Sequence, residues 1–166
     1  GGGIRALEHH SEAIEALFAH IPGLKVVYPS TPYDAKGLLA SAIQDPDPVI
    51  YLEPKKIYRA FKQDVPENEY LVPIGKAKVF YAAKDPNVTV VSWGAMVHDA
   101  VKAVRALEAE GVRAEVIDLR TISPIDYPTI YESVRKTGRL IVVSEAVKSF
   151  GVASEVITRV TENCFL

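Results

Sequence analysis

Two adjacent histidines lie near the start of this chain, directly before a serine that can cap a helix. His9 and His10 precede Ser11, and apolar residues at helical spacing continue as far as Ile21. The first turn of a helix carries partial positive charge, which favours neutral imidazole over imidazolium. A neutral imidazole at a cleft can donate a hydrogen bond or transfer a proton near neutral pH. His9 and His10 are therefore candidates for acid–base chemistry; the alternative is a surface residue beside a satisfied cap.

A second candidate site is an acidic turn at the end of a predicted helix over residues 34–43. Two Asp-Pro pairs follow this helix, at Asp45 and Asp47. The last carbonyl groups of the helix, those of Ala42 and Ile43, lack helical partners and lie at the negative end of its dipole. Carbonyl and carboxylate oxygens together suit a hard cation such as potassium, and magnesium or calcium less well. An ordinary turn, in which the aspartates bind their own backbone, is the alternative.

Most other catalytic motifs are missing from the sequence. No dinucleotide-binding or P-loop glycine pattern occurs, no nucleophile elbow is present, and no cysteine–histidine cluster has zinc spacing. The glycine triplet at residues 1–3 is typical of a flexible turn. Arg120 and Glu145 each follow a predicted strand, where α/β enzymes gather ligand contacts and where ordinary caps also occur.

The predicted elements alternate between strand and helix. Strands over 24–28 and 49–52 flank the helix over 34–43, which Ser30 or Thr31 can cap, and such a unit is nearly always parallel. Residues 54–75 are polar, with three prolines and several aromatic residues, and are expected to cross a surface and pack on it. Three further strand–helix pairs follow, with strands over 88–92, 114–119 and 140–144 and helices over 96–110, 127–136 and 152–162. This order predicts an α/β fold with a mostly parallel sheet.

Composition excludes several classes of partner. The 166 residues are 48% hydrophobic, which is enough for one or two compact domains. A net charge of −2 supplies no field for nucleic acid or an anionic membrane, and no apolar run is long enough to span a bilayer. The single cysteine, Cys164, cannot form an internal disulfide, which favours a reducing compartment. The chain begins with glycines and no methionine, so we interpret it as a piece of a larger protein.

Motifs along the whole chain resemble one enzyme family. Taken in order, they are similar to the β subunit of the thiamine-diphosphate-dependent decarboxylating component of 2-oxo acid dehydrogenase complexes, of the pyruvate or branched-chain type. The motifs occupy residues 9–12, 22–27, 29–39, 47–55, 58–59, 73–77, 116–122, 133–134, 136–139 and 144–146. Their number and order make the resemblance specific.

The resemblance implies a transketolase-like fold and a division of the chain. Residues 1–60 would be the C-terminal part of a pyrimidine-binding domain, residues 61–75 a linker, and residues 76–166 a truncated C-terminal domain. It also implies a heterotetramer of two α and two β subunits, with a lipoyl acyltransferase core as a further partner. Thiamine diphosphate would lie between the subunits, with its diphosphate and magnesium held by the α subunit.

The same resemblance implies roles for both candidate sites. His10 matches the family's active-site histidine, which hydrogen-bonds the substrate or its cofactor adduct and assists acyl transfer to the lipoyl group. Ala42, Ile43, Asp45 and Asp47 match the family's structural potassium site, largely through backbone oxygens. Asp47 stands where many members carry asparagine, and its added negative charge is compatible with a bound cation.

Several functions remain open. Oxidative decarboxylation of pyruvate is the leading hypothesis, and a branched-chain 2-oxo acid is a close alternative because residues 53–55 and 92–94 also resemble that branch. A non-catalytic assembly and docking module is another alternative, and half of a transketolase or synthase is disfavoured by the residues around His10. The family's activating glutamate and its aromatic pyrimidine contact would lie upstream of Gly1, so we expect the 166 residues alone to be inactive. The expected compartment is the cytoplasm, or the mitochondrial matrix in a eukaryote.

Overall fold

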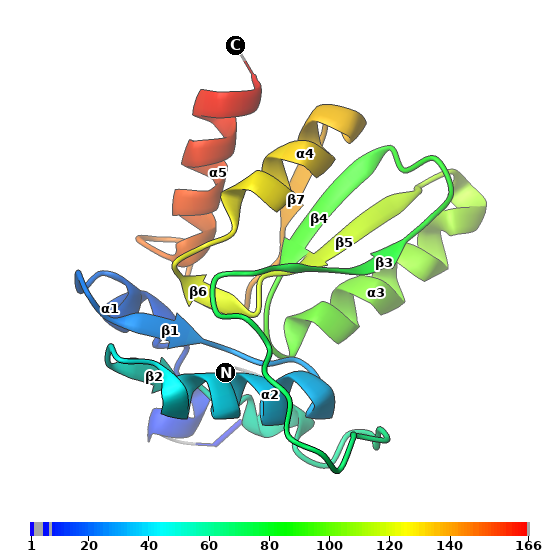
Figure 1. The fold of residues 1–166 in the computed structure, drawn as a ribbon. Coiled ribbons are helices and arrows are strands. Elements are labelled where there is room, and N and C mark those ends of the chain that lie inside the picture. The colour runs from blue at the N-terminus through cyan, green and yellow to red at the C-terminus, as the bar shows by residue number, and fades with distance from the viewer. Residues whose placement is uncertain (2–4, 7, 166) are drawn as a thin grey trace.

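Helices and strands alternate along the chain in the computed structural model, which describes residues 1, 5–6 and 8–165 (Figure 1). The strands are β1 (Lys25–Val27), β2 (Val49–Tyr51), β3 (Lys78–Ala82), β4 (Val88–Ser92), β5 (Ala114–Asp118), β6 (Thr121–Ser123) and β7 (Leu140–Val142). The helices are α1 (Glu15–Ala19), α2 (Pro32–Gln44), α3 (Met96–Leu107), α4 (Tyr127–Thr137) and α5 (Val152–Cys164), with short 3₁₀ turns at Glu8–Ser11, Lys55–Ile57 and Glu108–Glu110. Among the described residues, no helix is both long and apolar enough to cross a membrane.

Two sheets organise these elements. The larger sheet has the order β3-β5-β4-β7, in which β4 pairs in parallel with both β5 and β7, while β3 is antiparallel to β5. The smaller sheet has the order β2-β1-β6, with β1 and β2 parallel and β6 antiparallel. The predicted α/β fold with a mostly parallel sheet is confirmed. The two antiparallel edge strands were not predicted, because short edge strands carry little periodic signal.

The core lies on both faces of the larger sheet. All residues of β4 and β5 are buried, as expected of strands that helices cover on two sides. Val91 and Ile117 pack with buried residues of α4 and α5, whereas Val90 and Val116 pack with those of α3. Figure 1 shows α3 on one side of this sheet and α4 with α5 on the other. The central strands β4 and β5 therefore lie at the centre of the core, covered on both faces.

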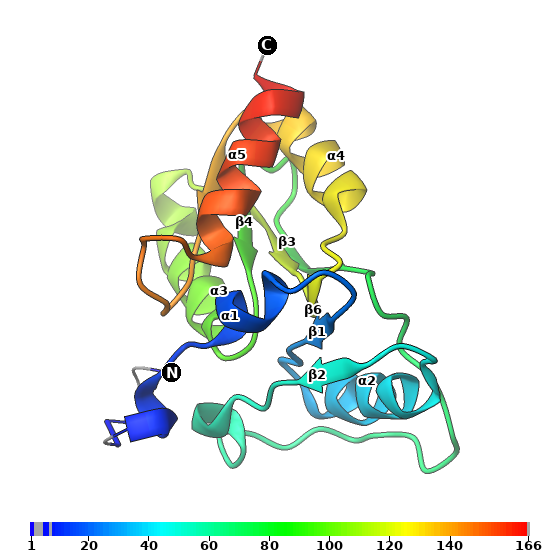
Figure 2. The same cartoon turned by 90° about the vertical axis from the view of Figure 1, so that its left-hand side faces the viewer.

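Residues 58–77, which we call the crossing segment, run along α2 (Figure 2). The ring of Tyr70 stacks on Tyr33 with centroids 4.5 Å apart, and Val72 is buried. The ammonium of Lys36 donates hydrogen bonds to three consecutive carbonyls, those of residues 66–68, at 2.5, 3.1 and 3.0 Å. The expectation that residues 54–75 pack on a surface is confirmed by these contacts of Tyr70, Val72 and residues 66–68.

Strand β6 connects the two parts of the chain. It follows β5 of the larger sheet, yet it pairs with β1, so residues far apart in sequence share the smaller sheet. Ser123 also donates a side-chain hydrogen bond to the carbonyl of Leu24, at 3.2 Å. The division at residues 60 and 75 stays a prediction, and the two parts are joined by direct strand pairing.

Candidate functional site: the His10 turn and the acidic turn after α2

His10 lies in the 3₁₀ turn Glu8–Ser11, and its side chain is exposed. The prediction that a helix begins at Ser11 is wrong. The hydroxyl of Ser11 donates a hydrogen bond to the carbonyl of Ala6, which precedes the 3₁₀ turn, and it does not cap a following helix. Helix α1 begins only at Glu15, and its N-cap residue Ile14 forms no side-chain cap. Both histidines occupy the last turn of their 3₁₀ helix, so the expected dipole effect of a helix start does not act on them.

The imidazole of His10 is available to a ligand. It forms no hydrogen bond or ion pair with any part of the chain that the structure describes, whereas His9 Nδ1 lies 3.9 Å from the carboxylate of Glu12. Geometry therefore separates the two neighbours: His9 has a local acidic partner, and His10 faces outward without one. An exposed imidazole can reach atoms of a second polypeptide or a shared ligand.

The segment that carries His10 is attached to the larger sheet through α1. Glu15, the first residue of α1, is buried, and its Oε1 accepts a hydrogen bond from Trp93 Nε1 at 3.0 Å. Trp93 follows β4 directly. Gly94, with φ of 56°, lies against the ring of Tyr28, since a Cβ on this glycine would come 3.1 Å from a ring carbon. The turn after β4 thus contacts both α1 and the residue after β1.

Two acidic groups act electrostatically on the hydroxyl of Tyr28. Burial raises the pKa of Tyr28 well above the ordinary value for tyrosine, and the negative charges of Glu15 and Glu145 raise this pKa further. The phenol therefore stays protonated at every physiological pH. Glu145 follows β7, at the strand-end position noted in the sequence.

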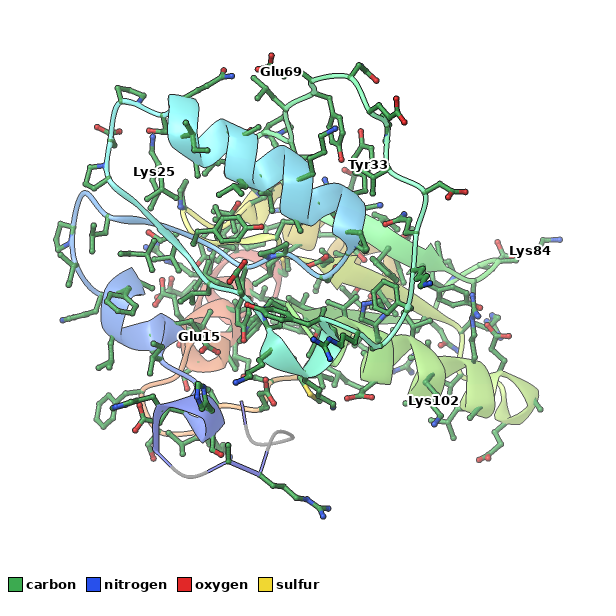
Figure 3. The ribbon with its side chains drawn as sticks, turned by 90° about the horizontal axis from the view of Figure 1, so that it is seen from below. Glu15, Lys25, Tyr33, Glu69, Lys84 and Lys102 are labelled. Carbon is green, nitrogen blue, oxygen red and sulfur yellow. The ribbon has the colours of Figure 1, made fainter. Side chains whose placement is uncertain are left out.

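The acidic turn after α2 holds a lysine between its carboxylates. Lys25 Nζ lies 2.7 and 2.9 Å from the two oxygens of Asp45 and 3.0 Å from Oδ2 of Asp47. The side chain that reaches this turn starts from the first residue of β1, labelled in Figure 3. These hydrogen bonds raise the pKa of Lys25 and lower that of Asp45. The carboxylates are therefore neutralised by a cation that belongs to the chain.

The carbonyl oxygens at the end of α2 lack partners within the helix, whereas the carboxylates of the turn have a cationic partner. Pro46 has no N–H to offer the carbonyl of Ala42, and the N–H of Asp47 donates to Oδ1 of Asp45 at 2.9 Å instead of to Ile43. The residues predicted to bind potassium are thus brought together, with their carbonyls lacking helical donors. Over the described ranges, no group of three or more acidic, histidine or cysteine side chains could hold a metal ion. A potassium ion would therefore depend on carbonyl oxygens.

A buried polar network between α2 and the end of β5 was not predicted. Nη2 of Arg120 lies 2.5 Å from Oδ1 of Asp34, and Ser30 donates to Asp118. Burial raises the pKa of Asp118 to about 6, although the bond from Ser30 acts in the opposite direction. Arg120 and the Thr31 cap were each recognised in the sequence. Arg120 and Asp34 are 86 positions apart, however, and no sequence pattern indicated that they would meet.

His98 serves in packing. Its Nε2 lies 2.7 Å from the carbonyl of Ser30, and its ring contacts those of Phe61 and Phe80, with centroids 4.6 and 5.6 Å away. His98 thus joins α3 to the loop before α2 and to the crossing segment.

Comparison with known proteins identifies the class. The model of the transketolase pyrimidine binding domain matches residues 1–60, and that of the transketolase C-terminal domain matches residues 75–166. The chain belongs to the transketolase family, which confirms the fold that the sequence resemblance implied.

Individual relatives resemble the chain more closely than the family models do and name a particular enzyme subunit. The chain is 66% identical over 165 residues to the pyruvate dehydrogenase E1 component subunit beta of Acholeplasma laidlawii and 52% identical over 166 residues to that of Bacillus subtilis. These alignments cover 99% and 100% of the chain and 50% of each relative, so the chain spans about half the length of the curated relatives it matches. A solved structure described as a split gene transketolase, inactive beta4 tetramer, superposes with a TM-score of 0.76 at 30% identity, covering 92% of this chain and 49% of its own.

Proposed function

We propose that this chain is part of the β subunit of a pyruvate dehydrogenase decarboxylating component, which converts pyruvate to carbon dioxide and an acetyl group on lipoamide. The observation that carries the proposal is the 66% identity to such a subunit over nearly the whole chain. Pyruvate is favoured over a branched-chain 2-oxo acid because the relatives named above are pyruvate enzymes. The chain works in the cytoplasm, in keeping with its bacterial relatives.

His10 is the residue through which this chain acts on the substrate. When bound, thiamine diphosphate supplies the electron sink for decarboxylation of a 2-oxo acid. His10 donates a hydrogen bond to the reacting oxygen of the substrate and assists transfer of the acyl group to the lipoyl arm. Its exposed ring, without a partner in the described chain, supports a role at a boundary shared with another subunit.

The cofactor's diphosphate and magnesium are held outside this chain. The described residues offer no cluster of acidic side chains for a metal ion, which supports an α subunit as the partner that binds them. The complete assembly has two α and two β subunits, and a lipoyl acyltransferase core receives the acyl group. The relative described as an inactive tetramer of β chains supports the requirement for an α partner.

The turn after α2 binds potassium through main-chain oxygens. Ala42, Ile43, Asp45 and Asp47 supply these oxygens, and the free carbonyls of the first two support the assignment. Lys25 neutralises the carboxylates and keeps them away from the ion. The ion has a structural role, as the resemblance to the family implies.

The experiment is reconstitution of the full-length β subunit with its α subunit, thiamine diphosphate and magnesium. We expect carbon dioxide release from pyruvate and much slower release from 3-methyl-2-oxobutanoate. His10→Ala should lower acetyl transfer to lipoamide by about 100-fold, the lower range of general acid–base effects, whereas His9→Ala is the matched control and should retain activity.

Two outcomes would contradict the proposal. A preference for the branched 2-oxo acid would assign the chain to the branched-chain enzyme. Full activity of His10→Ala, or of a complex reconstituted without the β subunit, would instead favour a non-catalytic docking module.

A further inference from the structure

We propose that Glu15 and Trp93 are positioning residues that hold the His10 turn in register with the larger sheet. This inference rests on the proposed role of His10. The Glu15–Trp93 hydrogen bond is 3.0 Å long and joins residues 78 positions apart. It connects the segment that carries the imidazole to the end of the central strand β4.

Burial identifies Glu15 as the anchor of this segment. Among residues 1–20 whose burial the structure describes, Glu15 is the only buried side chain, with 2% of its surface exposed. Three residues separate α1 from the 3₁₀ turn that carries His10, and both histidines of this turn are exposed. Since the His10 side chain forms no hydrogen bond or ion pair with the described residues, its place depends on the backbone around it and on where α1 is attached.

Trp93 is a rigid partner for this anchor. It is 4% exposed and follows β4, whose residues pair with β5 on one side and β7 on the other. Its indole belongs to the same buried cluster as Ile117 and Val156. The N–H donor therefore cannot move without disturbing the sheet, which makes it a fixed reference point for α1.

The chemistry of the pair points beyond simple packing. The carboxylate of Glu15 is buried without an ion pair to any lysine, arginine or histidine in the described chain, and such burial costs free energy. An apolar residue would fill the site at lower cost, but it could not accept the single directed bond that Trp93 offers. A directed bond sets the position and the angle of α1, which apolar contact alone does not.

A double-mutant cycle in the reconstituted complex tests the inference. Trp93→Phe keeps an aromatic ring in the core and removes the N–H together with the five-membered ring of the indole, and Glu15→Leu removes the acceptor. Each should lower kcat for acetyl transfer by about 10-fold with little change in KM, because a small misplacement of a reacting group is costly. Glu15→Gln retains an acceptor oxygen and should restore most of the activity. Tyr127→Phe, which removes a hydrogen bond to Glu155 between α4 and α5, is the matched control.

The decisive measurement combines these changes with His10→Ala. If Glu15 and Trp93 act through His10, Trp93→Phe causes no further loss of kcat in the His10→Ala protein. An equal 10-fold loss in both backgrounds would overturn the positioning role while leaving the function of His10 intact. Equal damage by Glu15→Gln and Glu15→Leu would overturn the assignment to this hydrogen bond. Full activity of His10→Ala alone would instead reject the proposed function.

Discussion

Arg120 and Asp34 form an ion pair across the two parts of the chain, with Nη2 and Oδ1 2.5 Å apart. Asp34 lies in the first turn of α2 and is completely buried, and the Arg120 side chain is 12% exposed. Arg120 has a φ of 56°, a region that non-glycine residues seldom adopt, so its backbone is held in place to direct the guanidinium at α2. The same carboxylate also accepts a bond from Thr31, which caps the helix.

Breaking this ion pair from one side should destabilise the protein strongly. Asp34→Ala leaves the Arg120 guanidinium buried without its partner, which costs about 3–5 kcal/mol for buried pairs. Urea unfolding of the full-length subunit measures the loss. Glu155→Ala breaks the exposed pair with Arg159 on α5 and serves as the control, with no measurable change expected. Equal losses in both variants would show that Asp34 is not held as tightly as its burial implies.

Asp118 should make stability fall as the pH rises toward neutrality. Its pKa of about 6 in the folded chain lies above the value of 3.8 for the exposed group. Between these two values the folded state binds the extra proton, so stability decreases from about pH 4 to pH 6 and then levels off. Asp118→Asn removes this titration, so its stability relative to the original protein should improve as the pH rises. A pH-independent difference in unfolding free energy between the two proteins would reject the raised pKa.

Potassium should stabilise the turn after α2. At equal ionic strength, the melting temperature is expected to be higher in potassium chloride than in tetramethylammonium chloride. Of these two cations, only potassium can be coordinated by carbonyl oxygens, because tetramethylammonium is too bulky. Lys25→Met removes the cation that holds Asp45 and Asp47 and should lower the melting temperature in both salts. The potassium effect should persist in this variant, since the main-chain oxygens are unchanged. Equal melting temperatures of the original protein in both salts would refute the site.

Lys36 should control the order of the crossing segment. Lys36→Met loses three hydrogen bonds to the carbonyls of residues 66–68 and the contact of its ammonium with the Tyr70 ring, 5.1 Å from its centroid. Proteolysis within residues 58–72 is expected to become several-fold faster, because cleavage follows the population of open states. Lys62→Met, at an exposed lysine of the same segment, is the control. Unchanged cleavage in Lys36→Met would mean that the Tyr33–Tyr70 stack alone holds the segment.

The sequence by itself determined the local elements and the family. The strand–helix–strand unit β1-α2-β2, the Thr31 cap and helices α3 to α5 follow from periodicity, capping residues and glycine stops, which act over a few residues. The order of the motifs indicated the family, and the match to its active-site histidine favoured His10 over His9 as the candidate residue. Local patterns failed at Ser11, because a hydroxyl suited to cap a helix closes a 3₁₀ turn instead.

Only the tertiary structure decided which distant groups meet. The pairs Glu15–Trp93, Arg120–Asp34 and Lys25–Asp45 join separate elements, and the β6 edge strand takes its place from β1 and not from its own pattern. Each pairing depends on how the sheets and helices pack, which periodicity within one element does not encode. The chain's chemistry-bearing residues can therefore be recognised one at a time in the sequence, but their partners arise only when folding brings remote segments into contact.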